Sequence, residues 1–138
     1  MPGCPARMGP VIRIVVADDN EDMLELLKDI LQPEFEVIAT VRDGRDLLQA
    51  VQNLKPDIVI TDISMPEMSG IEATRKLVEE NPKAKVIILT VHTDRKIVDE
   101  GISAGANGYV FKLAAWRELT QAINEIMLGN VYISSHMK

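Results

Sequence analysis

The sequence has few of the features that mark secreted or membrane proteins. Its single cysteine, Cys4, cannot form a disulfide within the chain. No apolar run approaches the about 20 residues that a membrane-spanning helix needs. The first residues do not form a basic segment followed by an apolar one, as a secretory signal would. These absences favour a protein of the reducing cytoplasm that does not bind a membrane.

Positive charge is also scarce. The chain has 15 Lys and Arg against 21 Asp and Glu, for a formal net charge of −6. A broad nucleic-acid-binding surface needs the opposite balance, so we expect this chain itself to bind no nucleic acid. Neither G-x-G-x-x-G nor G-x-x-x-x-G-K occurs, which makes nucleotide binding the weakest hypothesis.

What the chain does have is a regular alternation of short apolar runs and helical patterns, within a length that suits one domain. Each apolar run precedes a stretch with apolar residues at helical spacing. The alternation predicts a single α/β domain, a doubly wound (βα)5 parallel sheet with helices on both faces. The expected strands are residues 11–17, 35–41, 58–60, 86–89 and 109–111.

Two terminal segments fall outside this pattern. Residues 1–10 hold three prolines and two glycines and no periodicity, so we expect a disordered leader. The folded domain is expected at residues 11–129, because Gly129 stops the last helical pattern. Residues 130–138 are expected to begin a linker or tail.

Polar residues follow the predicted strands at the points where the strands end. Asp18 and Asp19 follow the first strand, Asp62 the third, Thr90 the fourth and Lys112 the fifth. The carboxyl ends of parallel strands share one edge of a sheet, so these side chains should converge. Three neighbouring carboxylates repel one another unless a cation is present, and Mg²⁺ with oxygen ligands and retained waters is the natural candidate.

Such a site suits phosphoryl chemistry. A divalent ion, an ammonium and a hydroxyl together can neutralise a phosphoryl group during transfer. A carboxylate can accept that group as a covalent nucleophile, and Asp62 lies between the expected metal side and Lys112. Phosphorylation there would add roughly one to two negative charges. We therefore predict that Asp62 is the reactive group.

Four separated motifs support this prediction in the right order: the acids Asp18-Asp19, DISMPEMSGIEA from Asp62, ILTVH around Thr90, and AGANGYVFK ending at Lys112. Together they resemble the receiver domain of two-component response regulators, a flavodoxin-like or CheY-like fold. The resemblance implies that a partner sensor histidine kinase phosphorylates Asp62. A conformational change then controls an output, such as transcription.

The resemblance also implies roles for the other residues. Asp19, Asp62 and the backbone carbonyl of Ser64 would bind Mg²⁺ directly, and Asp18 would assist through water. Thr90 and Lys112 would contact the phosphoryl oxygens, and Thr90 with Tyr109 would form the switch. Ser64 and His92, each two residues after a site residue, would tune the rate of hydrolysis.

Two further motifs, HTD from His92 and LGNVYIS from Leu128, resemble the NarL/FixJ-type subfamily. Receivers of that subfamily usually precede a LuxR-type helix-turn-helix, which this chain lacks, so we expect a truncated chain rather than a stand-alone receiver. The resemblance implies a possible homodimer on phosphorylation. Leu113 follows the lysine where many receivers have proline, which bears on the shape of the loop.

Several alternatives remain open. A Mg²⁺-dependent phosphohydrolase would share the nucleophile, but it would need a general acid where Ser64 stands and a cap domain. A phosphate-independent interaction module could keep the same fold. Asp62 could merely stabilise a turn, and Tyr109 is as consistent with a core residue as with a switch. The preferred hypothesis is a phosphoacceptor that promotes its own phosphorylation and dephosphorylation and is not otherwise an enzyme.

Overall fold

The computed structural model describes residues 11–65, 67–92 and 94–134. The leader expected at residues 1–10, Thr93 of the HTD motif and the end of the expected tail lie outside the described residues. In the described part of the chain, no helix is both long and apolar enough to cross a membrane.

One parallel sheet forms the centre of the molecule, with the strand order β2-β1-β3-β4-β5-β6. This order confirms the predicted doubly wound fold. Because β3 lies between β1 and β4, its carboxyl end has neighbours on both sides. The strands are β1 (Arg13–Ala17), β2 (Glu36–Val41), β3 (Ile58–Asp62), β4 (Lys85–Thr90), β5 (Gly108–Phe111) and β6 (Tyr132–Ile133).

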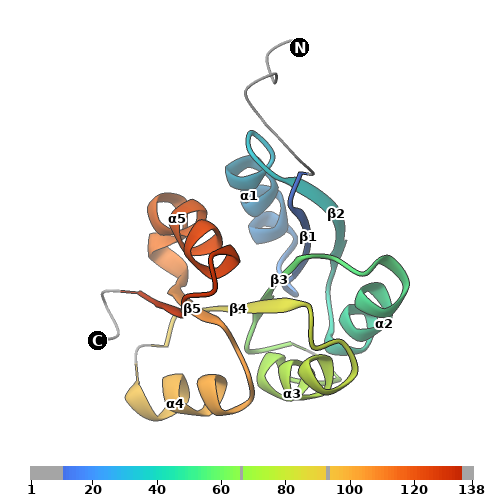
Figure 1. Ribbon diagram of the computed structural model, residues 1–138, viewed down its shortest axis with the longest axis vertical. Helices are drawn as coiled ribbons and strands as arrows, with labels where there is room; N and C mark the ends of the chain where they lie inside the picture. The colour runs from blue at the N-terminus through green and yellow to red at the C-terminus, as the bar shows by residue number, and fades with distance from the viewer. Residues whose placement is uncertain (1–10, 66, 93, 135–138) are drawn as a thin grey trace.

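Helices cover both faces of the sheet (Figure 1). On one face, apolar side chains of α1 and α5 pack against the sheet, and on the other those of α2, α3 and α4 do so. The buried strand residues supply both cores, because alternate side chains point to opposite faces. The helices are α1 (Glu21–Leu31), α2 (Gly44–Leu54), α3 (Gly70–Glu80), α4 (Arg95–Ser103) and α5 (Ala115–Met127), and a short 3-10 turn, η2 (Lys112–Ala114), precedes α5.

Polar caps start four of these helices where the strand–helix loops end. The side chain of each cap residue accepts a hydrogen bond from a backbone N–H of the first turn. Ser69 caps α3 in this way through the Glu72 amide, and Asn20 caps α1 through the Met23 amide. Asp43 and Asp94 cap α2 and α4. The caps fix where each loop at the carboxyl edge of the sheet ends.

The last strand differs from the sequence-based expectation. Residues 130–138 were expected to begin a tail, yet Tyr132–Ile133 forms β6 and pairs in parallel with Gly108–Tyr109 of β5. The fold is therefore (βα)5 with one further strand, and α5 is the crossover between β5 and β6. A strand of two residues has too little alternation to be recognised as a pattern.

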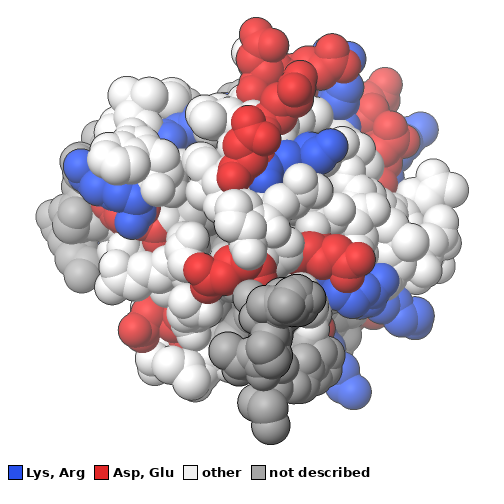
Figure 2. All heavy atoms as spheres, turned by 90° about the horizontal axis from the view of Figure 1, so that it is seen from above, with Lys and Arg blue, Asp and Glu red and all other residues white. Residues whose placement is uncertain are grey.

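Charged side chains of both signs share the surface. Figure 2 shows Lys and Arg interspersed among Asp and Glu on the face seen from above, without a continuous basic patch on that face. This distribution agrees with the net charge of −6.

Candidate functional site

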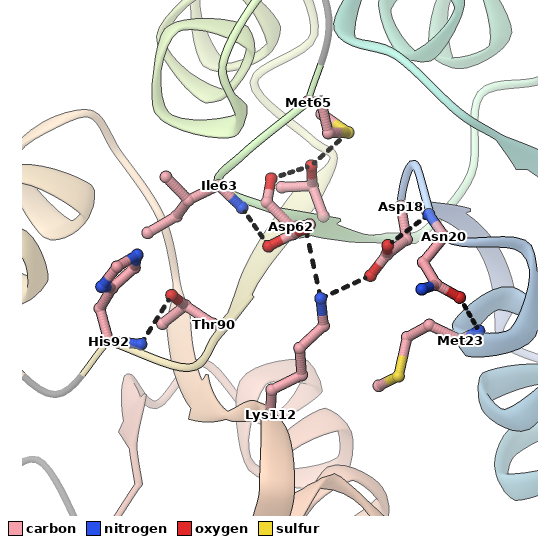
Figure 3. A network of polar contacts seen from close by, with 10 residues as sticks. Asp18, Asn20, Met23, Asp62, Ile63, Met65, Thr90, His92 and Lys112 are labelled. Carbon is pink, nitrogen blue, oxygen red and sulfur yellow. Dashed lines mark hydrogen bonds and ion pairs between the residues drawn. The ribbon is translucent and has the colours of Figure 1, made fainter.

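The carboxyl ends of β1, β3 and β5 bring together Asp18, Asp62 and Lys112 (Figure 3). The Lys112 ammonium lies between the two carboxylates, 2.9 Å from Asp18 Oδ2 and 3.2 Å from Asp62 Oδ2. One cation thus serves two acids from separate strands.

Asp62 is the last residue of β3 and is only 8% exposed. Its Oδ1 accepts a hydrogen bond of 2.8 Å from the Ile63 amide, and its Oδ2 faces Lys112. Burial raises the pKa of Asp62 and the charge of Asp18 adds to the rise, although Lys112 and the Ile63 amide oppose it. The raised pKa means that the ionised carboxylate of Asp62 is less stable here than in water.

Asp18 is completely buried. Its Oδ1 accepts a hydrogen bond of 2.9 Å from the Asn20 amide. Its Oδ2 makes the ion pair with Lys112 without a well-directed hydrogen bond. A buried carboxylate oxygen in this condition is ready to accept from a water molecule or to face a cation.

Lys112 begins the η2 turn directly after β5, and Leu113 behind it is 71% exposed. Burial alone would lower the pKa of Lys112, but the two carboxylates outweigh that effect and raise it. The lysine therefore stays charged at neutral pH and holds the two acids together.

Asp19 completes an acidic group. Ligand oxygens of Asp18, Asp19 and Asp62 all lie within 4.8 Å of one another. Asp19 is exposed, so one side of the group is open to water. Three carboxylate oxygens, one of them buried without a well-directed donor, fit a hard divalent ion that keeps part of its water shell. The site can therefore hold a metal ion.

Thr90 ends β4, the neighbour of β3 on the side away from β1. It is buried, and its Oγ1 accepts a hydrogen bond of 3.1 Å from the His92 amide. Figure 3 shows Thr90 at the same edge as Asp62, with no interaction drawn between them. The side chains of Ser64 and His92 are exposed, and within the described residues neither makes a hydrogen bond or ion pair with the acidic group.

Tyr109 on β5 is fully buried, and its ring packs beneath α4: a Cβ at Gly101 would lie 2.9 Å from the ring atom Cε2. Burial and then the charge of Glu100 raise the pKa of Tyr109 far above its ordinary value. The Thr90 hydroxyl opposes this rise, although no well-directed hydrogen bond joins the two hydroxyls. The ring is part of the core, and its hydroxyl has no hydrogen-bond partner among the described residues.

Sequence reasoning missed several groups that hold the site. The amides of Asn20 and Ile63 are backbone donors and carry no side-chain signal. Arg42, just after β2, donates to the Asp19 carbonyl over 3.2 Å and pairs with Glu21 at 3.7 Å. Its position at the end of the second predicted strand, beside the acids of the first, was the signal that could have identified it.

The Gly70 backbone lies against Asp62. A Cβ on Gly70 would lie 1.9 Å from the Asp62 carbonyl oxygen. The Gly70 amide donates to the Ile63 carbonyl over 2.7 Å. Only a residue without a side chain allows α3 to start this close to β3.

Comparison with known proteins defines the class. A model of the response regulator receiver domain matches residues 14–124, and the chain belongs to this family. It is 38% identical over 124 residues to the transcriptional regulatory protein DegU of Brevibacillus brevis, covering 88% of this chain and 52% of that protein. It is 35% identical over 115 residues to the chemotaxis protein CheY of Thermotoga maritima, covering 83% of this chain and 96% of that protein.

A solved structure narrows the assignment. The crystal structure of a LuxR-family two-component response regulator from Aurantimonas sp. SI85-9A1 superposes with a TM-score of 0.87 at 31% identity and covers 93% of each chain. The chain is thus a receiver of the NarL/FixJ type, as predicted. It spans about half the length of DegU.

Proposed function

We propose that Asp62 accepts a phosphoryl group from a sensor histidine kinase. An Asp62 carboxylate oxygen attacks phosphorus, the bond from phosphorus to the donor nitrogen breaks, and the leaving histidine nitrogen takes up a proton. The observation that carries the proposal is the placement of Asp62: a nearly buried carboxylate at the end of the central β3, 3.2 Å from Lys112 and grouped with Asp18 and Asp19.

Asp18, Asp19 and Asp62 would hold Mg²⁺, together with the Ser64 backbone carbonyl. The ion would supply charge neutralisation for the phosphoryl oxygens. Lys112 contributes a second positive charge, because the neighbouring carboxylates of Asp18 and Asp62 keep its amine protonated. Thr90 contributes a hydroxyl at the same edge. Lys112 and Thr90 would hold the phosphoryl oxygens after transfer.

Thr90 and Tyr109 would carry the switch. If the Thr90 hydroxyl turns toward the phosphoryl group, the surroundings of the buried Tyr109 hydroxyl would change with it, because the two residues lie on the neighbouring strands β4 and β5 and the Tyr109 hydroxyl has no hydrogen-bond partner among the described residues. A change at β5 would then alter the surface of α4, β5 and α5. Ser64 and His92, exposed beside the site, would set how fast water reaches the aspartyl phosphate.

The chain would catalyse its own phosphorylation and dephosphorylation without acting on another substrate. As part of a longer protein, it would control transcription through a DNA-binding domain outside this chain, and it would form a homodimer on phosphorylation. We place it in the cytoplasm, because histidine kinases draw their phosphoryl groups from ATP.

The test is incubation with acetyl phosphate and Mg²⁺ followed by intact-protein mass spectrometry. We expect one added phosphoryl group in the wild type and in Asp29→Asn, a control at an exposed carboxylate on α1. We expect none in Asp62→Asn, and none in the wild type with EDTA. An unmodified wild type, or modification that survives Asp62→Asn, would refute the proposal. Turnover of a small phosphate ester would instead favour the phosphohydrolase.

A further inference from the structure

A third buried carboxylate, in addition to Asp18 and Asp62, lies away from the acidic site. Glu118 on α5 is only 7% exposed, and its Oε1 accepts hydrogen bonds from the hydroxyls of Tyr132, at 3.0 Å, and Ser134, at 2.8 Å. A carboxylate is strongly disfavoured in a protein interior unless donors replace its water. Both donors come from residues 132–134, so the burial of Glu118 depends on that segment being docked.

The same segment holds the backbone of β5. The Tyr132 amide donates to the Asn107 carbonyl over 3.1 Å, and the Ser134 amide donates to the Tyr109 carbonyl over 2.8 Å. Ile133 lies opposite Tyr109 in the strand register. Ser134 therefore binds the proposed switch residue with its amide and Glu118 with its hydroxyl.

The other end of β5 leads to the acidic site. The strand has four residues and ends at Phe111, directly before Lys112, whose ammonium bridges Asp18 and Asp62. One short, stiff element is thus joined to the acidic group at its carboxyl end and to residues 132–134 along its side. A displacement of β5 changes both sets of contacts.

The segment is short, and Ser134 is its one completely buried residue. β6 is two residues long, and the side chains of Tyr132 and Ile133 are only partly buried. It follows Gly129, which has a φ of 97° and no atom within 4 Å of where a Cβ would lie. If residues 132–134 leave, water can solvate Glu118 and both hydroxyls. Release of the segment would therefore leave none of these polar groups without a hydrogen-bond partner.

We propose that residues 132–134 form a latch on β5, that Glu118 holds the latch closed, and that a phosphoryl group on Asp62 loosens it. The proposal rests on the proposed function of Asp62. The latch contacts are those of β5 in the unmodified protein, and a phosphoryl group competes with Asp18 and Asp62 for Lys112. A shift of β5 that satisfies the new group costs latch contacts. By linkage, the closed latch in turn disfavours the modified state.

Amide hydrogen exchange at Tyr132 and Ser134, measured by NMR in Mg²⁺ with and without acetyl phosphate, tests the latch. We expect phosphorylation to speed exchange of these amides by at least about fivefold in the wild type. In Glu118→Gln they should exchange faster before phosphorylation, and acetyl phosphate should modify a larger fraction of the protein. Glu79→Gln, a control at an exposed carboxylate on α3, should match the wild type.

The outcomes separate the two proposals. Modified Asp62 with unchanged exchange at Tyr132 and Ser134, or Glu118→Gln with wild-type exchange and phosphorylation, overturns the latch and leaves the proposed function standing. An unmodified Asp62 overturns the function, and the coupling with it. Should Glu118→Gln fail to fold by circular dichroism, Tyr132→Phe removes one donor only and decides the question by the same two measurements.

Discussion

Replacing Asp62 with asparagine should stabilise the protein in the absence of divalent ions. The reason is that Asp18, Asp19 and Asp62 lie so close together that the single charge of Lys112 does not offset their mutual repulsion. Asparagine keeps the shape of the side chain and can still accept from the Ile63 amide, but it removes one negative charge. The substitution therefore measures what the ionised Asp62 costs the fold.

The expected size follows from the distances. At an effective dielectric constant of about 20, two unit charges 4.8 Å apart, the largest separation within the group, interact by about 3.5 kcal/mol. The Lys112 ammonium at 3.2 Å attracts Asp62 by about 5 kcal/mol on the same basis. Repulsion from Asp18 and Asp19 together then exceeds this attraction by about 2 kcal/mol. Because Asp19 is exposed and screened, we expect a net gain of about 1 kcal/mol for Asp62→Asn.

The dependence of stability on pH independently gives the sign of the Asp62→Asn effect. The pKa of Asp62 is raised above its ordinary 3.8, chiefly by burial. Its contribution to stability is therefore fully present below that value and is lost as the pH rises through the folded-state pKa. The advantage of Asp62→Asn should accordingly be absent at the acid end, grow across this window and be complete at pH 7.

Saturating Mg²⁺ should make the wild type more stable than Asp62→Asn. An ion that binds only the folded wild type adds about 2.7 kcal/mol to the free energy of unfolding at 100 times its dissociation constant. Asp62→Asn has lost one of the three ligands and should gain less. The assay is urea unfolding followed by circular dichroism, in EDTA and in saturating Mg²⁺, with Asp29→Asn as the control.

Two results would contradict this reasoning. One is an Asp62→Asn variant that is less stable than the wild type in EDTA at pH 7. The other is a variant that gains as much stability from Mg²⁺ as the wild type does, which would place the ion elsewhere.

Three further predictions follow from single contacts. Lys112→Met leaves Asp18 without its cation and should lower the free energy of unfolding by about 3 kcal/mol in EDTA. Mg²⁺ should restore part of this loss, because it also neutralises the acidic group. A loss that Mg²⁺ does not reduce would contradict the idea that Lys112 and Mg²⁺ neutralise the same carboxylates. Gly70→Ala puts a Cβ 1.9 Å from the Asp62 carbonyl oxygen and should cost about 2 to 3 kcal/mol and slow phosphorylation by acetyl phosphate; wild-type thermal unfolding would show that the loop adapts. Burial, with the Glu118 carboxylate, raises the pKa of Tyr132 to about 12. The stabilising effect of the protonated Tyr132 hydroxyl should therefore persist below pH 10 and be lost as the pH rises through 12. In an ultraviolet titration Glu118→Gln should lower this pKa, and an unchanged titration would refute the contact.

Much of the fold follows from local pattern. The five predicted strands appear within about two residues of their expected ends, because buried parallel strands read as continuous apolar runs bounded by polar residues. The convergence of Asp18, Asp62 and Lys112 also follows, since it depends only on strand order and direction.

The remainder depends on contacts that a linear pattern does not carry. Glu118 shares a helical face with Ala122 and Ile126, yet a glutamate in the first turn of a helix normally reaches solvent. Its burial depends on hydrogen bonds from the hydroxyls of Tyr132 and Ser134, which lie 14 and 16 residues further along the chain. The close approach of Gly70 to Asp62 likewise depends on the three-dimensional path of the loop.

The brevity of β6 has a consequence for assembly. An edge strand normally offers its free amides and carbonyls to any other strand that comes near, and long flat edges are where sheets of separate molecules join. With the latch closed, this side of the sheet ends in two residues, Tyr132 and Ile133, too few to guide an incoming strand. On this side of the molecule, a sheet continuous between two copies of the chain would then form only after β5 is uncovered, whereas the six-residue β2 forms the opposite edge.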